Sequence, residues 1–208
     1  VADLDVIVEQ IDRLHDTTRE ILGLARPRSG EPVDLAELVH SAHYVLQAEA
    51  RKRGVDVRAA EIQPFGTVPG SAAAWQTVVF NLMLNAIEHT PAGQTIDVSL
   101  TCDDGAPEGG TSNDGTSKDS IVFTTSNPGQ PLDAETERRI FEPFISQGGT
   151  GLGLPLVARR VSELGGSIEV HSQAGQIRFE VRVAQAAGTP AADASNGPEP
   201  ASSTEESP

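Results

Sequence analysis

Hydrophobic positions recur at alternating steps of three and four along the first 25 residues of the chain. They are Leu4, Ile7, Ile11, Leu14, Thr18, Ile21 and Ala25. This a/d spacing, held for about three heptads, is typical of a coiled-coil helix. One helix cannot bury such a stripe alone, so residues 1–28 predict a partial dimerisation bundle that pairs with another chain or segment. The alternative is a first helix packed on the chain's own globular domain.

Alternating helical and strand patterns fill the region from residue 34 to residue 183. Helical spacing predicts helices at 34–53, 71–89, 133–141 and 154–164. Period-two alternation predicts strands at 55–60, 96–101, 121–125, 167–171 and 176–183. The second helix is apolar nearly all round, so it must be central and buried. These elements predict an α+β fold, a two-layer sandwich in which a mixed, mainly antiparallel sheet of about five strands is covered on one face by about three helices.

Turn and capping residues mark the ends of these elements and of the domain. Asp34 is a good N-cap for the first of the four helices, and Gly54 is a good C-cap. A Gly-, Asp- and Ser-rich stretch at 102–120 predicts a flexible loop between two strands. The Ala/Pro/Ser/Glu composition of 184–208 supports no core, which predicts a disordered acidic tail after a globular domain at 29–183.

The charge and cysteine content exclude several classes of protein. Acidic residues outnumber basic ones by 30 to 15, a formal net charge of −15. The excess has the wrong sign for coating nucleic acid or an anionic membrane. The single cysteine, Cys102, excludes a disulfide scaffold and suits a reducing compartment. No stretch approaches the roughly 20 apolar residues of a membrane span, and no signal peptide is visible. We therefore expect a cytoplasmic protein. Because the chain begins with Val1 and not with Met, the alternative is a cytoplasmic piece of a longer protein.

A row of polar side chains interrupts the apolar helix predicted at 71–89. Asn81, Asn85 and His89 are spaced by four residues and so leave one face of the helix. Buried amides need partners, so either they bond neighbouring backbone or they line a polar cleft that faces a ligand. An Asn oxygen in such a cleft can bind a hard cation such as Mg²⁺, together with water and phosphate oxygens.

A glycine-rich run, GGTGLGL at 148–154, leads directly into the last predicted helix. Glycines allow backbone N–H groups to approach a phosphate closely, and a helix N-terminus adds partial positive charge. The run fits neither the Rossmann pattern, since no strand leads into it, nor a Walker loop, since it lacks Gly-Lys-Ser/Thr. Taken alone, it is equally consistent with a flexible hinge.

Two shorter motifs lie between the strands and this glycine run. Asn127-Pro128-Gly129 follows a strand that should be central, so it is either a simple turn or a place where the Asn127 amide meets the edge of an adenine. The sequence FEPF at 141–144 has two aromatic residues around a proline. It would either anchor a lid or pack in the core.

Together, these motifs resemble the ATP-binding catalytic domain of bacterial sensor histidine kinases, in the superfamily of Hsp90, gyrase and MutL. WQTVVFNLMLNAIEHT at 75–90 is similar to the N box of that family, NPGQP at 127–131 to its first glycine box, FEPF to its F box and GGTGLGLPLV at 148–157 to its second glycine box. The resemblance covers roughly residues 33–183. It implies a Bergerat fold, with ATP held between the N-box helix and a lid.

The resemblance also implies roles for individual residues. It implies catalytic and phosphate-proximal roles for Asn81, Asn85 and His89, with Asn85 as the Mg²⁺ ligand. Its further nucleotide-binding positions are Asn127, Gly129, Pro131, Phe144, Gly149, Thr150, Gly151, Leu152, Gly153 and Leu154. It implies a protein-histidine kinase that takes ATP and Mg²⁺, forms a homodimer through the N-terminal bundle, and passes the phosphoryl group to the aspartate of a response-regulator receiver domain. No nucleic acid and no direct membrane insertion are expected.

The sequence departs from the family pattern at several of these positions. Asn127 replaces the usual aspartate, Pro131 replaces a glycine, and Ile177 stands where Thr or Ser is common. Glu88 would repel phosphate if it pointed inward. The acceptor-histidine helix is missing, so a second hypothesis is a degenerate, non-catalytic nucleotide sensor or dimerisation module. An ATP-hydrolysing chaperone or topoisomerase relative is disfavoured by Asn81, because an amide cannot take the proton of an attacking water.

Overall fold

The computed structural model describes residues 32–62, 66–103, 120–145 and 151–186. The predicted helix at 1–28 lies outside the described residues. So do most of the loop predicted at 102–120 and nearly all of the tail predicted from residue 184. Gly149 and Thr150, two of the predicted nucleotide-binding residues, also lie outside them.

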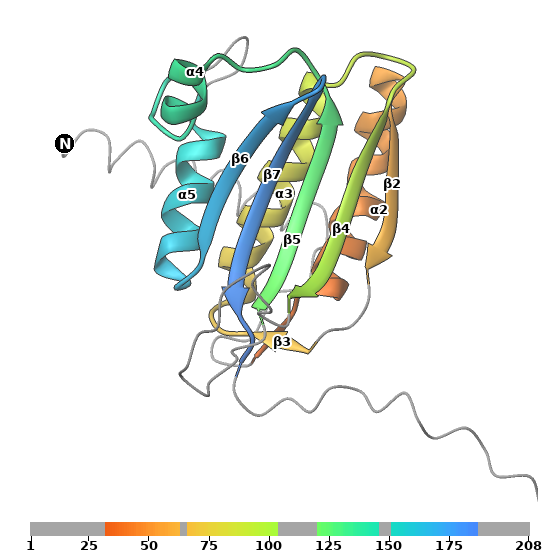
Figure 1. Ribbon diagram of the computed structural model, residues 1–208. Coiled ribbons are helices and arrows are strands. Elements are labelled where there is room, and N and C mark those ends of the chain that lie inside the picture. The colour runs from red at the N-terminus through yellow and green to blue at the C-terminus, as the bar shows by residue number, and fades with distance from the viewer. Residues whose placement is uncertain (1–31, 63–65, 104–119, 146–150, 187–208) are drawn as a thin grey trace, which may run out of the picture.

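The centre of the protein is a five-stranded sheet with strand order β2-β4-β5-β7-β6 (Figure 1). The strands are β2 (Asp56–Ile62), β4 (Thr95–Asp103), β5 (Ser120–Pro128), β6 (Ser167–Gln173) and β7 (Gln176–Ala184). β2 runs parallel to β4, and the other pairs are antiparallel. The predicted mixed, mainly antiparallel sheet is confirmed.

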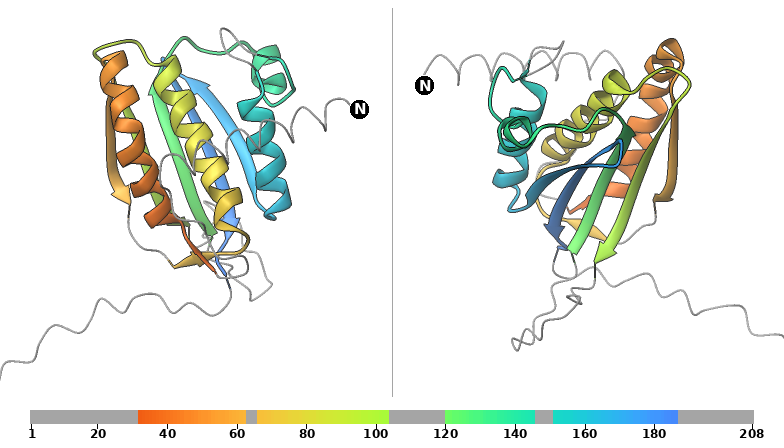
Figure 2. Two further views of the ribbon diagram at one scale, coloured as in Figure 1. Left: turned by 180° about the vertical axis from the view of Figure 1, so that it is seen from behind. Right: turned by 45° about the horizontal axis from the view of Figure 1, so that its top comes forward.

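Three helices cover one face of this sheet, as the view from behind shows (Figure 2). They are α2 (Leu35–Arg53), α3 (Ala72–His89) and α5 (Gly153–Glu163), with α3 packed between the other two. A short helix, α4 (Ala134–Arg139), lies beside the N-terminal end of α5 (Figure 1). The two-layer α+β sandwich predicted from the sequence is confirmed.

The predicted caps of α2 are present and explain where this helix begins and ends. The Asp34 carboxylate accepts the backbone N–H groups of Ala36 at 2.8 Å and Glu37 at 3.4 Å. Gly54 adopts the left-handed conformation, with φ of 69°, and its N–H bonds the last carbonyls of the helix. Both ends of α2 are therefore fixed by the residue types that helix termini favour.

The core lies between the sheet and the helices, and α3 supplies much of it. The largest fully buried side chains include Trp75, Phe123, Phe179, Leu35, Leu82 and Met83. The indole N–H of Trp75 donates to the carbonyl of Pro69 at 2.9 Å, so its polar atom is satisfied inside the core. The prediction that the helix at 71–89 is central and buried is correct.

A second, two-stranded sheet lies below the main one in the view of Figure 1, and the sequence pattern does not predict it. β1 (Val33–Asp34) pairs antiparallel with β3 (Thr67–Val68). The backbone N–H of Ala186 donates to the carbonyl of Thr67 at 2.8 Å, so the chain just after β7 is tied to the same place. Strands of two residues carry too little periodicity to be recognised in a sequence.

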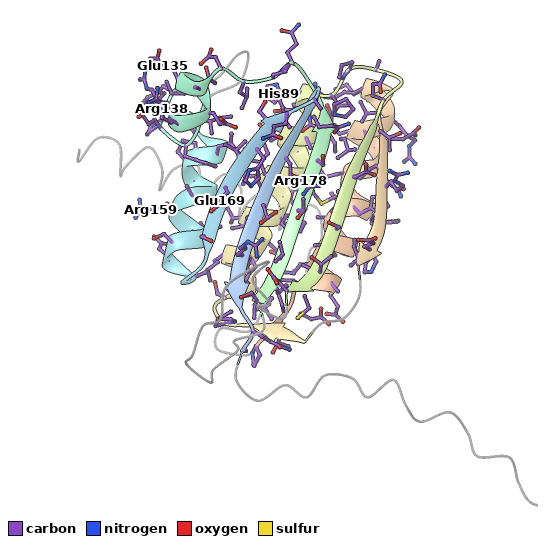
Figure 3. The ribbon with its side chains drawn as sticks, viewed as in Figure 1. His89, Glu135, Arg138, Arg159, Glu169 and Arg178 are labelled. Carbon is purple, nitrogen blue, oxygen red and sulfur yellow. The ribbon has the colours of Figure 1, made fainter. Side chains whose placement is uncertain are left out.

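The second face of the sheet carries no helix among the described residues and is polar (Figure 3). Glu169 and Arg178 lie on this face, and Arg58 forms an ion pair with Asp97 across β2 and β4 at 2.5 Å. Within the described part of the chain, no helix is both long and apolar enough to cross a membrane.

Candidate functional site

The polar row predicted on the apolar helix lies on α3 and reaches the neighbouring helix α5. Asn81 and Asn85 are half-buried, and His89 is exposed at the end of α3 (Figure 3). The Asn81 amide nitrogen donates to the carbonyl of Thr77, one turn earlier, at 2.7 Å. That bond fixes the orientation of the carboxamide, and within the described residues no hydrogen bond to its oxygen is present.

The Asn81 oxygen lies against the first residue of α5. A Cβ atom placed on Gly153 would come within 3.2 Å of Asn81 Oδ1, which is closer than most real Cβ contacts. Glycine at position 153 is therefore what allows the carboxamide and the helix N-terminus to meet. The structure brings together two residues that are 72 positions apart in sequence, from two separate predicted motifs.

The N-terminus of α5 is arranged to receive negative charge. Leu152 is its N-cap and makes no side-chain capping bond. The first backbone N–H groups of a helix have no acceptor within the helix, and here they belong to Gly153 and Leu154. The helix dipole adds about half a positive charge at this end. The Asn81 carboxamide therefore borders a place where backbone donors and the dipole both favour an anion.

The two aromatic residues of the FEPF segment have different surroundings. Phe141 packs edge-on against Phe179 of β7, with ring centroids 6.3 Å apart, which agrees with core packing. Phe144 is 61% exposed, and its φ is 66°. Only Phe144 therefore offers an apolar ring to something outside the core.

The backbone of Phe144 is joined to the glycine-rich segment. The Phe144 N–H donates to the carbonyl of Gly151 at 2.9 Å. Gly151 has φ of 67°, and a Cβ on it would lie 2.8 Å from Phe144 Cα. Both features require glycine at position 151. This contact brings the chain before residue 146 and the chain after residue 150 together at the N-terminal end of α5.

The end of β5 forms a second cluster of predicted site residues, and β5 is longer than predicted. Asn127 lies inside the strand, paired with Ile177 of β7, and only 1% of it is exposed. Its amide nitrogen donates to the carbonyl of Pro128 at 3.2 Å. Gly129 follows, and its N–H bonds the carbonyl of Gly175 at 3.0 Å, whereas Pro131 is exposed.

Close packing also explains the glycine at position 129. A Cβ there would come within 2.9 Å of the Cδ1 atom of Ile177. Ile177 therefore forms an apolar wall beside Gly129 and Asn127. The interpretation of Asn127-Pro128-Gly129 as a simple turn after the strand is incomplete, because the Asn127 side chain points into a buried position on β5.

One buried polar group near this cluster was not recognised in the sequence. Thr125 is fully buried on β5, two residues before Asn127, and its hydroxyl has no hydrogen-bond partner among the described residues. A threonine at a buried strand position is common, because its shape suits a sheet, so the sequence gives no signal for it. Only the three-dimensional surroundings identify the hydroxyl as unsatisfied.

The carboxylate of Glu88, one residue before His89, contacts an arginine of α2. It lies 3.7 Å from the Arg53 guanidinium, and 42% of the Glu88 side chain is exposed. The Glu88 carboxylate is therefore paired with a positive charge of α2.

The short helix α4 is capped at its N-terminus and bonded to β6 through its middle. The carboxylate of Asp133 accepts the backbone N–H of Thr136 at 2.7 Å and that of Glu135 at 3.0 Å. These bonds, chiefly the one from Thr136, lower the pKa of Asp133. The Glu137 carboxylate accepts the backbone N–H of Ser172 on β6 at 3.2 Å. A shallow pocket of about 130 Å³ between α4 and Ile145 is lined by polar residues of α4 and its cap.

The described residues contain no ready-made cage for a metal ion. No group of three or more His, Cys, Asp or Glu side chains is close enough to hold one in this part of the chain. Asn85, the predicted metal ligand, is a half-buried amide on the same helix face as Asn81. A cation at this place would need ligands from a bound molecule or water.

Comparison with known proteins gives a family match over most of the described domain. A family model described as "Histidine kinase-, DNA gyrase B-, and HSP90-like ATPase" matches residues 70–187. Sporulation kinase A of Bacillus subtilis is 26% identical over 173 residues, which cover 81% of this chain and 26% of that protein. Sensor histidine kinase ZraS of Salmonella typhimurium is 28% identical over 176 residues, which cover 82% of this chain and 35% of that protein. The chain thus spans about a quarter to a third of the length of these relatives.

Solved structures share the fold at lower sequence identity. The structure of full-length ShkA in complex with AMPPNP aligns with a TM-score of 0.63 at 24% identity, covering 86% of this chain and 38% of that one. The catalytic domain of histidine kinase ThkA aligns with a TM-score of 0.59 at 24% identity, covering 74% of this chain and 97% of that one. Both alignments show that the chain shares its fold with these proteins.

Proposed function

The chain belongs to the family of histidine kinase-, DNA gyrase B- and HSP90-like ATPases, and on that premise we propose that it is the ATP-binding catalytic core of a sensor histidine kinase. The observation that carries the proposal is the meeting of the Asn81 oxygen with Gly153 at the N-terminus of α5. It joins the two motifs that would bind a triphosphate. The relatives named sensor histidine kinase and the neighbour that binds AMPPNP support the same conclusion.

ATP would lie along the side of α3 that faces α5. The phosphates would meet the backbone N–H groups of the 149–154 segment and the polar row of Asn81, Asn85 and His89. The adenine would meet Asn127 at the end of β5, where the free amide oxygen is an acceptor for the exocyclic amine. Gly129 and Ile177 would form the wall beside the base, and Phe144 would border the open side.

The Asn85 amide oxygen fits the chemistry of Mg²⁺, which binds few protein ligands and keeps phosphate oxygens and waters as the others. The lack of a preformed acidic cage among the described residues is consistent with a cation that arrives with the nucleotide. When bound, Mg²⁺ would offset charge on the triphosphate. Asn85 would hold the Mg²⁺ ion. Asn81 would help to position the phosphates at the N-terminus of α5, where the helix dipole is positive.

The side chains favour transfer of the γ-phosphoryl group to a histidine over rapid hydrolysis. In transfer, a bond forms between the γ-phosphorus and an imidazole nitrogen, the bond to the β–γ bridging oxygen breaks, and ADP leaves. Asn81 is an amide and cannot accept a proton from water at neutral pH. The chain's own contribution would therefore be positioning and electrostatic stabilisation, which are the main terms in phosphoryl transfer.

The acceptor histidine would come from another segment or another chain. The heptad pattern at residues 4–25 suits the second helix of a dimerisation bundle, so we propose a homodimer through that helix. The phosphoryl group would then pass to the aspartate of a response-regulator receiver domain in the cytoplasm. These assignments rest on the sequence pattern and on the relatives' names.

Thermal melting with ATP, with and without Mg²⁺, tests the binding step. We expect ATP to raise the melting temperature of the unmodified chain, and Mg²⁺ to increase the rise. The Asn85→Ala variant should lose the Mg²⁺-dependent part, and Gln47→Ala, which removes a carboxamide from α2, should retain it. A full Mg²⁺-dependent rise in Asn85→Ala would remove the metal assignment, and no rise in the unmodified chain would overturn the proposal.

Radiolabelled ATP tests the transfer step. The chain is mixed with a helix-bundle fragment of a related kinase that carries its acceptor histidine. Acid-labile label on the fragment is expected for a kinase. Nucleotide binding without label on the fragment would instead support the non-catalytic sensor module. Rapid release of inorganic phosphate would support an ATPase and contradict the role given to Asn81.

A further inference from the structure

Tyr44 is a large aromatic residue in the middle of α2 whose side chain is left uncovered. It is 79% exposed, and the other exposed large hydrophobic residue of the described chain, Phe144, is 61% exposed. α2 lies at one end of the helix layer, beside α3 and the edge strand β2 (Figure 2). Tyrosine is among the residues that contribute most to binding at protein interfaces. An uncovered ring at this place is therefore a candidate contact for another molecule.

Four more exposed residues share the face of α2 that carries Tyr44. Helical spacing of about 100° per residue places each of them within about 40° of the direction of Tyr44. They are Glu37, His40, Ala48 and Arg51. The core residues of α2 lie on its other face. These four residues and Tyr44 form one continuous exposed stripe, the Tyr44 face.

The Tyr44 face is arranged symmetrically about its central residue, with opposite charges at its two ends. Glu37 lies seven residues before Tyr44, and Arg51 lies seven residues after it. His40 and Ala48 are each four residues from Tyr44. Two copies of α2 that cross antiparallel at Tyr44 would therefore bring each Glu37 carboxylate opposite the Arg51 guanidinium of the other copy. The small Ala48 would lie opposite His40, which leaves room for the imidazole ring.

The two end charges are not used within the described part of the chain. No ion pair of the Glu37 or Arg51 side chain is present there, whereas the neighbouring Lys52 and Arg53 both pair with Glu49. An acidic partner would be attracted by Arg51 and repelled by Glu37, and a basic partner would meet the reverse. A second copy in antiparallel orientation is complementary at both ends.

We propose that the Tyr44 face of α2 binds the same face of a second copy of this chain, in antiparallel orientation. The contact is isologous, so each residue contributes twice and Tyr44 lies on the two-fold axis. One helix pair buries less than the roughly 1,200 Å² of a stable interface. The contact is therefore weak alone and forms between copies that are already held close together. It does not depend on nucleotide binding.

The single tyrosine of the chain gives a direct test of this contact. Ruthenium-sensitised photo-oxidation of the whole, unmodified chain joins tyrosine rings that touch, and the product is a covalent dimer with dityrosine fluorescence. We expect such a dimer, because the two Tyr44 rings meet on the axis. The control carries Tyr44→Phe and Ser162→Tyr, which move the tyrosine to an exposed position of α5. It should give only the low yield of random collisions.

Charge reversal tests the antiparallel orientation. Glu37→Lys or Arg51→Glu alone places like charges at both ends of the contact, so each variant should give about tenfold less covalent dimer. Co-expression of the two variants restores opposite charges at both ends. It should recover most of the yield, in dimers that contain one chain of each kind, as their mass shows. Both substitutions also oppose the helix dipole, but that effect lies within each chain and pairing cannot reverse it.

Three results would overturn the inference. The first is a yield in the unmodified chain no higher than that of the control, which is expected if residues 1–28 or a different protein cover the Tyr44 face. The second is an equal yield in the unmodified chain and in both charge variants. The third is a co-expressed pair that gives no more dimer than either variant alone.

Milder substitutions keep the test open if either charge variant does not fold. Glu37→Gln and Arg51→Gln each remove one charge without reversing it. Each should lower the yield of covalent dimer about threefold, because both ends of the contact lose an ion pair. Unchanged yields in these two variants would also overturn the inference.

Discussion

The carboxamide oxygen of Asn81 and the backbone of Gly153 approach so closely that a Cβ on Gly153 would lie 3.2 Å from that oxygen. The contact joins the middle of α3 to the first residue of α5. It depends on the 2.7 Å bond from the Asn81 nitrogen to the Thr77 carbonyl, which orients the amide. A helix start without a side-chain cap and an amide oriented from the neighbouring helix together define where a phosphate would fit.

Gly153→Ala should separate nucleotide binding from stability. Gly153 lies in the first turn of α5 and has no left-handed backbone, so alanine is allowed and favours the helix by up to about 1 kcal/mol. The new methyl group would displace the Asn81 oxygen, so we expect ATP affinity to fall about tenfold, or about 1.4 kcal/mol. Calorimetry and thermal melting measure the two effects. Unchanged affinity would mean that Asn81 does not border the nucleotide.

Gly151→Ala and Gly165→Ala form a matched pair of substitutions. Both glycines have a left-handed backbone, with φ of 67° and 75°, so both variants should lose about 1–2 kcal/mol for the conformation alone. Only at Gly151 would the new Cβ meet backbone, 2.8 Å from Phe144 Cα, whereas nothing lies within 4 Å at Gly165. We therefore expect Gly151→Ala to unfold at lower denaturant concentration than Gly165→Ala.

Nucleotide binding adds a second comparison for the same pair. The Phe144–Gly151 hydrogen bond holds Gly151, a predicted nucleotide-binding residue, at the N-terminal end of α5, so Gly151→Ala should also weaken ATP binding. Gly165 lies at the far end of α5, and its variant should bind ATP like the unmodified chain. Equal losses of stability and of affinity in the two variants would show that the contact with Phe144 contributes nothing beyond the backbone conformation.

Glu88→Gln tests whether the Glu88 carboxylate pairs with α2 or faces the nucleotide. Because the Glu88 carboxylate pairs with Arg53 of α2 at 3.7 Å and is well exposed, its removal should change the free energy of unfolding by less than about 1 kcal/mol. ATP affinity at moderate salt should change little, because the Glu88 carboxylate is paired with the Arg53 guanidinium. A large gain in ATP affinity would show instead that Glu88 faces the phosphates.

The sequence predicts the elements well because their periodicities are long and clear. The apolar face of α3, the caps Asp34 and Gly54, and the β6–β7 hairpin follow from local rules that tertiary contacts reinforce. The bounds differ most at β5, which extends to Pro128. A strand that ends in Asn-Pro resembles a turn in sequence, and only the pairing of Asn127 with Ile177 shows that it continues.

The relations within the candidate site are harder to predict. Spacing places Asn81 on a helix face but does not indicate that its oxygen lies against Gly153, which depends on how α5 crosses α3. The direction of Glu88 depends on Arg53, which is 35 residues away in sequence. The unsatisfied hydroxyl of Thr125 depends on Val98 and Phe179. In each case, the decisive neighbour is on another element.

The N-cap of α4 gives the protein a stability term that depends on pH. Backbone N–H bonds, chiefly that from Thr136, lower the pKa of Asp133 in the folded state. A carboxyl group whose pKa is lowered by folding stabilises the fold when ionised. The contribution is therefore complete above the unfolded-state pKa of about 3.9, and it is lost as the pH falls through the lower folded-state pKa.

Asp133→Asn isolates this term, because asparagine also caps helices but does not titrate. As the pH falls from neutral to below 4, the melting temperature of the unmodified chain should fall more steeply than that of the variant. Other carboxylates with lowered pKa, such as Glu49 and Glu163, are present in both proteins, so their contributions cancel in the difference. Parallel curves over this range would mean that the Asp133 cap adds no pH-dependent stability. A steeper fall only in the unmodified chain would show that α4, next to the Phe144 segment, is held by an ionised cap.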